Sequence, residues 1–324
     1  MTEALGYADL SPQQVLDALD AVGLRGDGRI LQLNSYENRV FQLFLEDGSA
    51  VVAKFYRPGR WSDAQILEEH AFALELAAAE VPVVPPLPLP GCSTQPPTLA
   101  HHGGHRFSVS PRCAGREPEL DDPEVMRQIG RFIGRLHAVG RRQPFAHRHR
   151  LDPQVDGERA FALLADGGFV PPDQLPAWAD ACRRALDAVA EAFAAPGDIA
   201  TLRLHGYCHI GNVLWRDGPN VVDLDDAMQG PAVQDLWMLV SGDRTSINAQ
   251  LNLLLDGYEQ FSDFDDRERR LIEPLRTLRM VRHAAWLAAR WSDPTFPLNF
   301  PFFGSAAYWN QQTVQLREQL EAMA

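Results

Sequence analysis

The chain has 324 residues, of which 45% are hydrophobic and 23% charged, as is typical of a folded protein with one large or two medium domains. Its formal net charge of −13 argues against nucleic-acid partners and anionic membrane surfaces, because both require a basic field. The N-terminus lacks a secretory signal pattern, no apolar run approaches the ~20 residues that span a bilayer, and the four cysteines show no paired spacing, so we expect a cytoplasmic protein.

The first elements predicted along the chain are a helix and a β-hairpin. The pattern predicts a capped helix over residues 11–23, strands over 40–45 and 50–56, and a tight turn between the strands. Alternation along the second strand places Lys54 on the same face as Val52 and Tyr56. The polar segment 33–39 precedes the first strand, so we expect it at a sheet edge, over the face that carries Lys54.

A second helix is predicted after this hairpin. Ser62 and Gln65 form a capping-box pattern that opens a helix ending near Ala79. At 100° per residue, Glu69 lies about 60° from the centre of the apolar stripe of this helix, and Glu68 about 160° away. We therefore expect Glu69 to turn toward the sheet and meet Lys54, and Glu68 to be exposed.

The remaining pattern predicts an α+β protein with two lobes. A last strand is expected over residues 107–111, and a long helix over 125–136 has apolar residues at helical spacing. From there the chain is predicted to be mostly helical, apart from a β-rich segment near 203–226. The expected fold is a small β-rich N-lobe over residues 1–112 and a large, mainly helical C-lobe over 113–324.

Lys54 is the only lysine among 30 basic residues, so its position is informative. An ammonium is a compact point charge, whereas a guanidinium is a flat fork suited to bidentate pairing. Kinase-type nucleotide sites use a strand lysine to hold phosphate oxygens and pair it with a helix glutamate. The alternative is a surface lysine that remains in a sequence biased toward arginine.

The β-rich segment contains a second hairpin pattern, with strands over 213–215 and 221–226. Because the turn lies midway between them, Asn212 and Asp223 are expected to converge. An amide oxygen and a carboxylate suit Mg²⁺, which takes few protein ligands. This pair alone fits a turn-stabilising role better, but together with Lys54 and Glu69 it predicts a nucleotide–metal site. A zinc site at His205, Cys208 and His209 is the alternative, and no fourth ligand for it is evident.

These loops carry a family resemblance. His205-Gly206 with Asn212, followed by Val222-Asp223, resembles the catalytic and metal-binding loops of the aminoglycoside phosphotransferase and choline kinase group, which is protein-kinase-like. Five longer segments, 33–41, 52–61, 66–76, 214–238 and 300–320, resemble the bacterial stress response kinase A (YihE or RdoA) family. The resemblance implies that the N-lobe binds the nucleotide and that the protein uses ATP and Mg²⁺ to phosphorylate Ser or Thr of proteins in a cytoplasmic stress response. We expect a monomer.

The resemblance also implies roles for single residues. Ser35 would lie over the phosphates, Lys54 would hold them with Glu69 as its partner, and Asn212 and Asp223 would bind Mg²⁺. His205 would brace the catalytic loop. Asp225 would be a further metal ligand or, more simply, a local hydrogen-bond acceptor.

Tyr207 departs from the family pattern, in which an aspartate follows the histidine by two residues and accepts the proton of the substrate hydroxyl. A phenol has an unperturbed pKa near 10, so it cannot act as this base near neutral pH. Loss of a general base costs about 10²–10⁴ in rate. We therefore expect Mg·ATP binding with poor phosphate transfer.

Two alternative functions and one question of packing remain open at this point. A small-molecule phosphotransferase of the aminoglycoside or choline kinase type would suit an acidic lobe that binds a cationic acceptor. A nucleotide-binding pseudokinase would act by docking to a partner. Finally, the aromatic-rich stretch 286–309 is expected to be helix-packing core, with a wall of the acceptor groove as the alternative.

Overall fold

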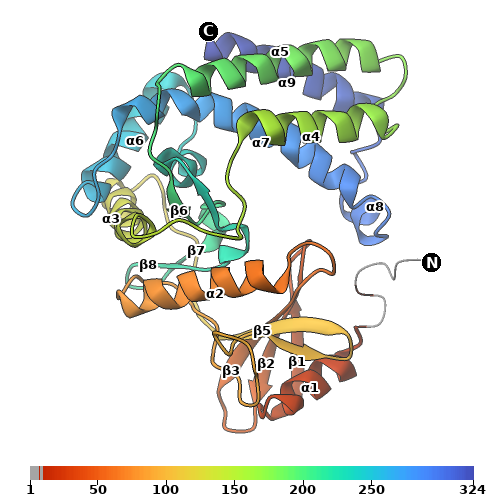
Figure 1. Cartoon of the computed structure of the whole chain (residues 1–324), viewed down its shortest axis with the longest axis vertical. Coiled ribbons are helices and arrows are strands. Elements are labelled where there is room, and N and C mark those ends of the chain that lie inside the picture. Colours follow the sequence, from red (N-terminus) through yellow and green to blue (C-terminus); the bar gives the residue numbers. More distant parts are fainter. Residues whose placement is uncertain (1–6, 8–9) are drawn as a thin grey trace. The chain divides into compact units, whose positions relative to one another are not determined.

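The computed structural model describes Tyr7 and residues 10–324. They form two compact units, one of the residues up to His149 with Leu202–Phe264, and one of Arg150–Thr201 with Asp265–Ala324. Figure 1 labels the elements of both units. The lobe boundary predicted between residues 112 and 113 differs from this division and stays a prediction.

The first unit contains an antiparallel sheet of five strands in the order β1-β2-β3-β5-β4. The strands are β1 (Gly26–Leu33), β2 (Arg39–Leu45), β3 (Ala50–Phe55), β4 (Ala100–His102) and β5 (His105–Pro111). The predicted hairpin is confirmed as β2 and β3, with Val40 opposite Lys54. The sequence pattern does not reveal β1, because most of its side chains are exposed and no apolar alternation marks it.

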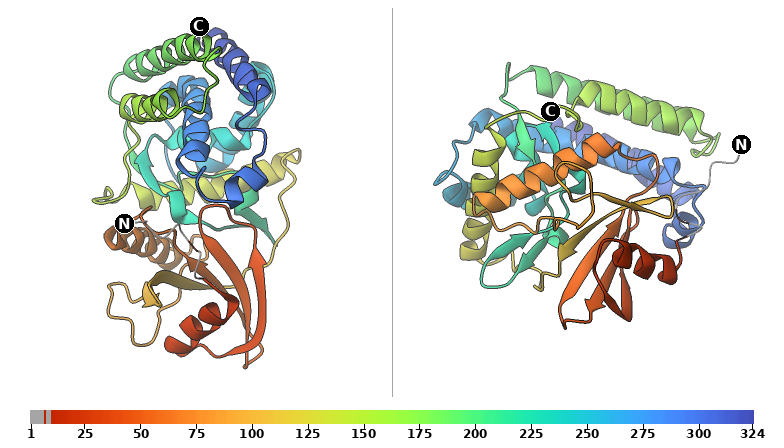
Figure 2. Two further views of the ribbon diagram at one scale, coloured as in Figure 1. Left: turned by 90° about the vertical axis from the view of Figure 1, so that its right-hand side faces the viewer. Right: turned by 60° about the horizontal axis from the view of Figure 1, so that its bottom comes forward.

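Helix α1 (Pro12–Ala21) packs against this sheet, as both views of Figure 2 show. Val15 and Leu19 are fully buried in one apolar cluster with Leu43 of β2. Along β3, buried side chains alternate with partly exposed ones, so Lys54 faces away from this cluster, as predicted.

Both predicted N-terminal helices begin at serine caps. Ser11 opens α1 and Ser62 opens α2 (Asp63–Ala78), each with a complete capping box. In such a box the serine side chain and the glutamine three residues later satisfy backbone groups that the first turn leaves unpaired. Local sequence therefore fixes where both helices start.

The two glutamates of α2 differ in their environment. Glu69 is buried, as its position near the apolar stripe predicts. The expectation that Glu68 is simply exposed is wrong, because its carboxylate accepts hydrogen bonds from the backbone N–H groups of Ala146, His147 and Arg148. Helical periodicity gives the direction of a side chain but not which distant segment lies there.

The rest of the first unit consists of helices and short strands. These elements are α3 (Pro123–Gly140), β6 (Leu202–Leu204), η1 (Ile210–Asn212), β7 (Val213–Trp215), β8 (Pro219–Val221), η2 (Leu224–Asp226), β9 (Met228–Gly230), η3 (Ala232–Asp235), η4 (Trp237–Leu239) and α6 (Arg244–Tyr258). Helices α3 and α6 approach closely, since a Cβ on Gly130 would lie 1.9 Å from the carbonyl oxygen of Leu254. The second predicted hairpin is β7 and β8, but its return strand ends at Val221 because Asp223 adopts a left-handed conformation.

The second unit is helical. It contains α4 (Pro153–Asp166), α5 (Leu175–Ala194), η5 (Asp266–Leu271), α7 (Ile272–Ala289), α8 (Thr295–Asn299) and α9 (Ala306–Met323). Trp178, Phe296, Phe303 and Trp309 are buried in its core, so the core prediction for most of the aromatic stretch is confirmed, whereas Phe302 is exposed. None of the helices that the structure describes is long and apolar enough to cross a bilayer. The α+β class is confirmed.

Candidate active site

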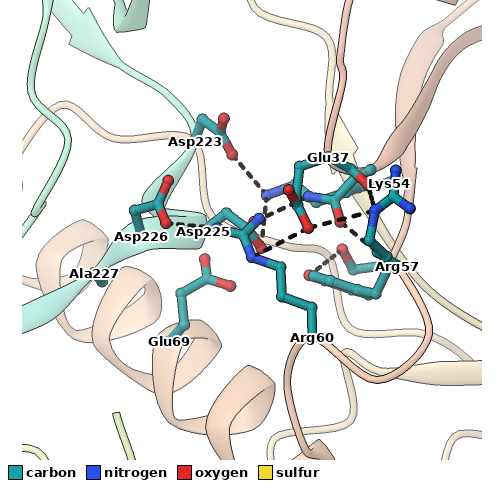
Figure 3. Close-up of polar contacts among 12 residues, drawn as sticks. Glu37, Lys54, Arg57, Arg60, Glu69, Asp223, Asp225, Asp226 and Ala227 are labelled. Atoms are coloured by element: carbon teal, nitrogen blue, oxygen red, sulfur yellow. Dashed lines mark hydrogen bonds and ion pairs between the residues drawn. The ribbon is translucent and has the colours of Figure 1, made fainter. Parts of the chain in front are cut away.

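Lys54 and the loop that follows β8 meet in the first unit. The Nζ atom of Lys54 lies 2.9 Å from Oδ1 of Asp223 and 4.0 Å from Oδ1 of Asp225 (Figure 3). Burial opposes the charge on the lysine, but the carboxylate of Asp223, followed by that of Asp225, raises the pKa of Lys54 well above its usual value. The unique ammonium is therefore charged, and it pairs with Asp223 of the predicted metal-binding pair and approaches Asp225.

Glu69 lies close to this group but does not pair with Lys54. Within the part of the chain that the structure describes, no ion pair joins the two residues, and Oε2 of Glu69 has no hydrogen-bond partner. Burial raises the pKa of Glu69 to about 7. Its neighbour His70 is neutral, because burial lowers the pKa of the imidazole to about 3, so the 3.8 Å contact between their side chains is not an ion pair. The role of Glu69 as partner of Lys54 stays a prediction.

The loop between β1 and β2, residues 34–38, is tied to the same group. Asn38 donates from Nδ2 to Oδ2 of Asp225 over 3.0 Å, and its Oδ1 accepts from the backbone N–H of Arg57. The guanidinium of Arg57 donates to two backbone carbonyls of this loop. Ser35 is partly exposed in the loop, and its contact with phosphate stays a prediction.

The simpler expectation, that Asp225 is only a local hydrogen-bond acceptor, is wrong. Its buried carboxylate is paired with Arg60, which also bonds Asp226 over 2.5 Å and approaches Glu37 at 3.6 Å (Figure 3). Burial alone would raise the pKa of Asp225, but Arg60, followed by Lys54, outweighs it and lowers the pKa to about 2. Asp225 is therefore an ionised group that links distant parts of the chain.

Arg148 holds the backbone of the same turn. Its buried guanidinium donates to the carbonyl oxygens of Asp225 over 2.6 Å and Ala227 over 2.8 Å, and it lies over the ring of Trp61. A guanidinium fixes several acceptors at once because its donors form a rigid fork. Arg148 thus sets the path of the chain directly after Asp223.

Asn212 and Asp223 lie at the mouth of the β7–β8 hairpin, as predicted. The backbone N–H of Val222 donates to the carbonyl oxygen of Asn212 over 3.0 Å, which brings the two backbones together. The side chain of Asn212 donates from Nδ2 to the carbonyl oxygen of Tyr207. This bond uses the NH₂ group, so the side-chain oxygen Oδ1 is the atom that can act as an acceptor or ligand. Asp223 has φ 65°, a conformation that is strained for this residue type and concentrates at functional sites, and its carboxylate is half exposed. These hard oxygen donors fit Mg²⁺.

His205 braces the two loops, as predicted. Its Nδ1 accepts from the backbone N–H of Tyr207, so the proton is on Nε2, which donates to the carbonyl oxygen of Val222 over 3.0 Å. Both the His205 and Gly206 backbone N–H groups donate to the carboxylate of Asp235 over 2.8 Å. The turn that contains Tyr207 is thereby fixed at both ends.

Tyr207 is partly buried, and the centroid of its ring lies 4.4 Å from that of the His209 ring. Cys208, which lies between these two residues in the sequence, is buried. Burial raises the pKa of its thiol well above the usual value and so disfavours the thiolate form that a zinc ligand requires. Across Tyr7 and residues 10–324, no group of three or more His, Cys, Asp and Glu side chains is arranged to hold a metal ion.

Sequence reasoning missed Arg60, Arg148 and Asp235. Arg60 and Arg148 are two of 30 basic residues, and only their buried positions distinguish them. Asp235 belongs to a Gln-Asp-Leu-Trp run that marks the family resemblance, but no local pattern reveals that its carboxylate holds the turn at His205.

Comparison with known proteins identifies the family of this chain. A family model described as phosphotransferase enzyme family matches residues 29–293. Stress response kinase A of Escherichia coli (strain K12) is 45% identical over 320 residues, which cover 99% of this chain and 95% of that protein. The serine/threonine protein kinase RdoA of Salmonella typhimurium (strain LT2) gives the same identity and coverage.

Solved structures of lower identity share the fold. The amicoumacin kinase hAmiN, in complex with AMP-PNP, Ca²⁺ and Ami, is 18% identical, covers 96% of this chain and 93% of its own, and superposes with a TM-score of 0.71. A microcompartment-associated aminopropanol kinase is 16% identical, with coverages of 94% and 95% and a TM-score of 0.69. These likenesses confirm the predicted kinase-like α+β fold. The full-length identity to curated relatives goes further: the chain belongs to the stress response kinase A family, within the phosphotransferase enzymes, and is an enzyme of the kinase type.

Proposed function

We propose that this chain is an ATP- and Mg²⁺-dependent serine/threonine protein kinase of the bacterial stress response. We further propose that it acts in the cytoplasm and that Tyr207 impairs its phosphate transfer. The observation that carries the proposal is the pairing of Lys54 with Asp223. This ion pair joins the single lysine of the sequence to the loop after β8 that contains Asp223, which we call the metal loop. The name of the curated relative RdoA supports serine and threonine as acceptors.

Lys54 and Asp223 neutralise each other when no nucleotide is bound. With a triphosphate bound, Lys54 would hold phosphate oxygens, and Asp223 would be available as a metal ligand. Asn212 and Asp223 would hold Mg²⁺, which when bound neutralises charge on the phosphates. Ser35 and the loop held by Asn38 and Arg57 would cover the phosphates.

Tyr207 determines what remains of catalysis. The base position needs a group that accepts a proton near neutral pH, and a phenol already carries one. Positioning by Lys54 and charge neutralisation at the metal loop do not depend on that base. The expected result is an enzyme that binds Mg·ATP well and transfers phosphate slowly.

The test compares the chain with its Tyr207→Asp variant. Calorimetry should show Mg²⁺-dependent uptake of AMP-PNP by both proteins. Transfer of ³²P from ATP to dephosphorylated casein should rise roughly 10²–10⁴-fold in the variant. Equal transfer by both proteins contradicts the assigned impairment, and absence of nucleotide uptake contradicts the site as a whole.

Tyr207 also favours a second candidate function, that of a pseudokinase which binds Mg·ATP and acts by docking to a partner. Thermal stabilisation by Mg·ATP with no ADP formed, by this chain and also by Tyr207→Asp, would establish it. The small-molecule phosphotransferase stays a prediction, and a panel of amino alcohols and aminoglycosides beside casein tests it.

A further inference from the structure

Arg60 places one cation among three carboxylates. It comes from the loop between β3 and α2, more than 160 residues before the metal loop, and its guanidinium bonds Asp225 and, over 2.5 Å, Asp226. On its other side, Nε lies 3.6 Å from the carboxylate of Glu37 (Figure 3). The side chains of Arg60 and Asp225 are only 13% and 4% exposed, whereas that of Asp226 is 40% exposed, so the Arg60–Asp225 pair is the buried part of this cluster.

Such a group of carboxylates needs a cation at its centre. Buried carboxylates are stable only when paired, and clustered carboxylate oxygens are also the ligands that Mg²⁺, Mn²⁺ and Ca²⁺ take. Even with Arg60 in place, Oδ1 of Asp225 is buried without a hydrogen-bond partner among the described residues, and the ammonium of Lys54 lies 4.0 Å from it. One buried oxygen of Asp225 is therefore left without a donor, although cations surround its carboxylate.

The two sides of the metal loop differ in access. The side chain of Asp223 is 50% exposed, whereas that of Asp225 is covered and held by Arg60 and by Asn38. A guanidinium can bridge Asp225 and Asp226 at once because its donors lie in a rigid plane, which a single ammonium cannot do. Arg60 thus pairs with the covered Asp225 and with Asp226, which is 40% exposed, whereas the exposed Asp223 pairs with Lys54.

We propose that Arg60 is a built-in counter-ion that occupies the place of a divalent cation between Asp225 and Asp226. It thereby confines metal binding in this loop to the position of Asn212 and Asp223. This inference rests on the proposed function, in which Asp223 binds the metal. Removal of the guanidinium should expose a new site for a hard divalent cation that needs no nucleotide.

The experiment counts Mn²⁺ ions bound per chain, from the loss of the free-ion signal in electron paramagnetic resonance, with and without AMP-PNP. Arg60→Gln should bind one more Mn²⁺ than the unmodified chain, and should do so without nucleotide. Adding Asp225→Asn to this variant should remove the extra ion. Arg29→Gln is the control, because it removes an exposed guanidinium that pairs with Asp27 away from this cluster, and it should bind no extra ion.

The outcomes separate this inference from the proposed function. If Arg60→Gln and the unmodified chain bind equal numbers of Mn²⁺, Arg60 is not a counter-ion in place of a metal. If the unmodified chain takes up no Mn²⁺ with AMP-PNP, the proposed function fails, while the nucleotide-free count still decides the role of Arg60. Should Arg60→Gln be unfolded in metal-free buffer, recovery of the fold on adding Mn²⁺ supports the proposal, and a chain that stays unfolded in saturating Mn²⁺ contradicts it.

Discussion

The ammonium of Lys54 and the carboxylate of Asp223 are 169 residues apart in sequence and 2.9 Å apart in the structure. Lys54 lies on a strand fixed by its own hairpin, and Asp223 follows a hairpin of its own. The two hairpins are folded by local interactions, and their meeting is a tertiary event. Each of the two charged groups balances the other.

Lys54→Met should abolish most nucleotide binding. The variant keeps the length of the side chain but loses a charged hydrogen-bond donor, which contributes about 1.5–3 kcal/mol, or roughly 10- to 100-fold in affinity. Calorimetry with Mg·AMP-PNP measures the loss. Arg29→Met, which removes an exposed ion pair with Asp27 on the same sheet, is the control. Unchanged affinity in Lys54→Met would rule out a phosphate-binding role for this lysine.

Glu69→Gln should change the pH dependence of stability. The folded-state pKa of Glu69 is raised from 4.5 to about 7 by burial, so the folded protein holds a proton that the unfolded chain has lost. The stability that this group gives is therefore complete below pH 4.5 and is lost as the pH rises through about 7. Over this range the loss approaches about 3 kcal/mol, at 1.36 kcal/mol per pKa unit.

The measurement for Glu69 is urea denaturation of the chain and of Glu69→Gln at about pH 5 and about pH 8. Gln stays neutral, so the variant should gain stability relative to the unmodified chain as the pH rises. Glu46→Gln, at an exposed turn position, should show no such gain. Parallel pH profiles for Glu69→Gln and the unmodified chain would show that this carboxyl does not titrate in the expected range.

Asp235→Asn should loosen the turn that carries Tyr207. The carboxylate accepts from the backbone N–H groups of His205 and Gly206 and from Nε2 of His137. An amide has one oxygen for these donors and brings N–H groups of its own, so we expect a loss of roughly 3 kcal/mol, the scale of a charged buried hydrogen bond. Urea denaturation measures it beside the exposed control Asp256→Asn. A loss below about 1 kcal/mol, the size of an ordinary hydrogen bond, would contradict the assigned role.

Gly206→Ala should be far more destabilising than Gly48→Ala. Both glycines have positive φ, 83° and 85°, so an alanine costs about 1–2 kcal/mol in backbone strain at either position. At Gly206, however, the new Cβ would also lie 2.1 Å from the carbonyl oxygen of Asp226, whereas nothing lies within 4 Å at Gly48. The difference between the two thermal unfolding midpoints measures the contact between the turn at Gly206 and the backbone at Asp226. Equal midpoints would show that this contact relaxes at no cost.

Local sequence determined a large part of this protein. The capping boxes at Ser11 and Ser62 fix where two helices begin, because their hydrogen bonds close within three residues. Alternation along β3 fixes the face of Lys54, and the β7–β8 turn brings Asn212 beside Val222. The family resemblance carried in these segments is confirmed by the relatives at 45% identity.

Only the tertiary structure decided the partners of the charged groups. Periodicity shows which way a side chain points, but an ion pair depends on what distant segment lies there. That is why Arg60 with Asp225, and Glu68 with the backbone at Ala146, could not be predicted, and why Lys54 is paired with Asp223 instead of Glu69. The sequence by itself determined most of the local elements and singled out Lys54, Asn212 and Asp223, whereas long-range packing added Arg60, Arg148 and Asp235 and decided which charges neutralise one another.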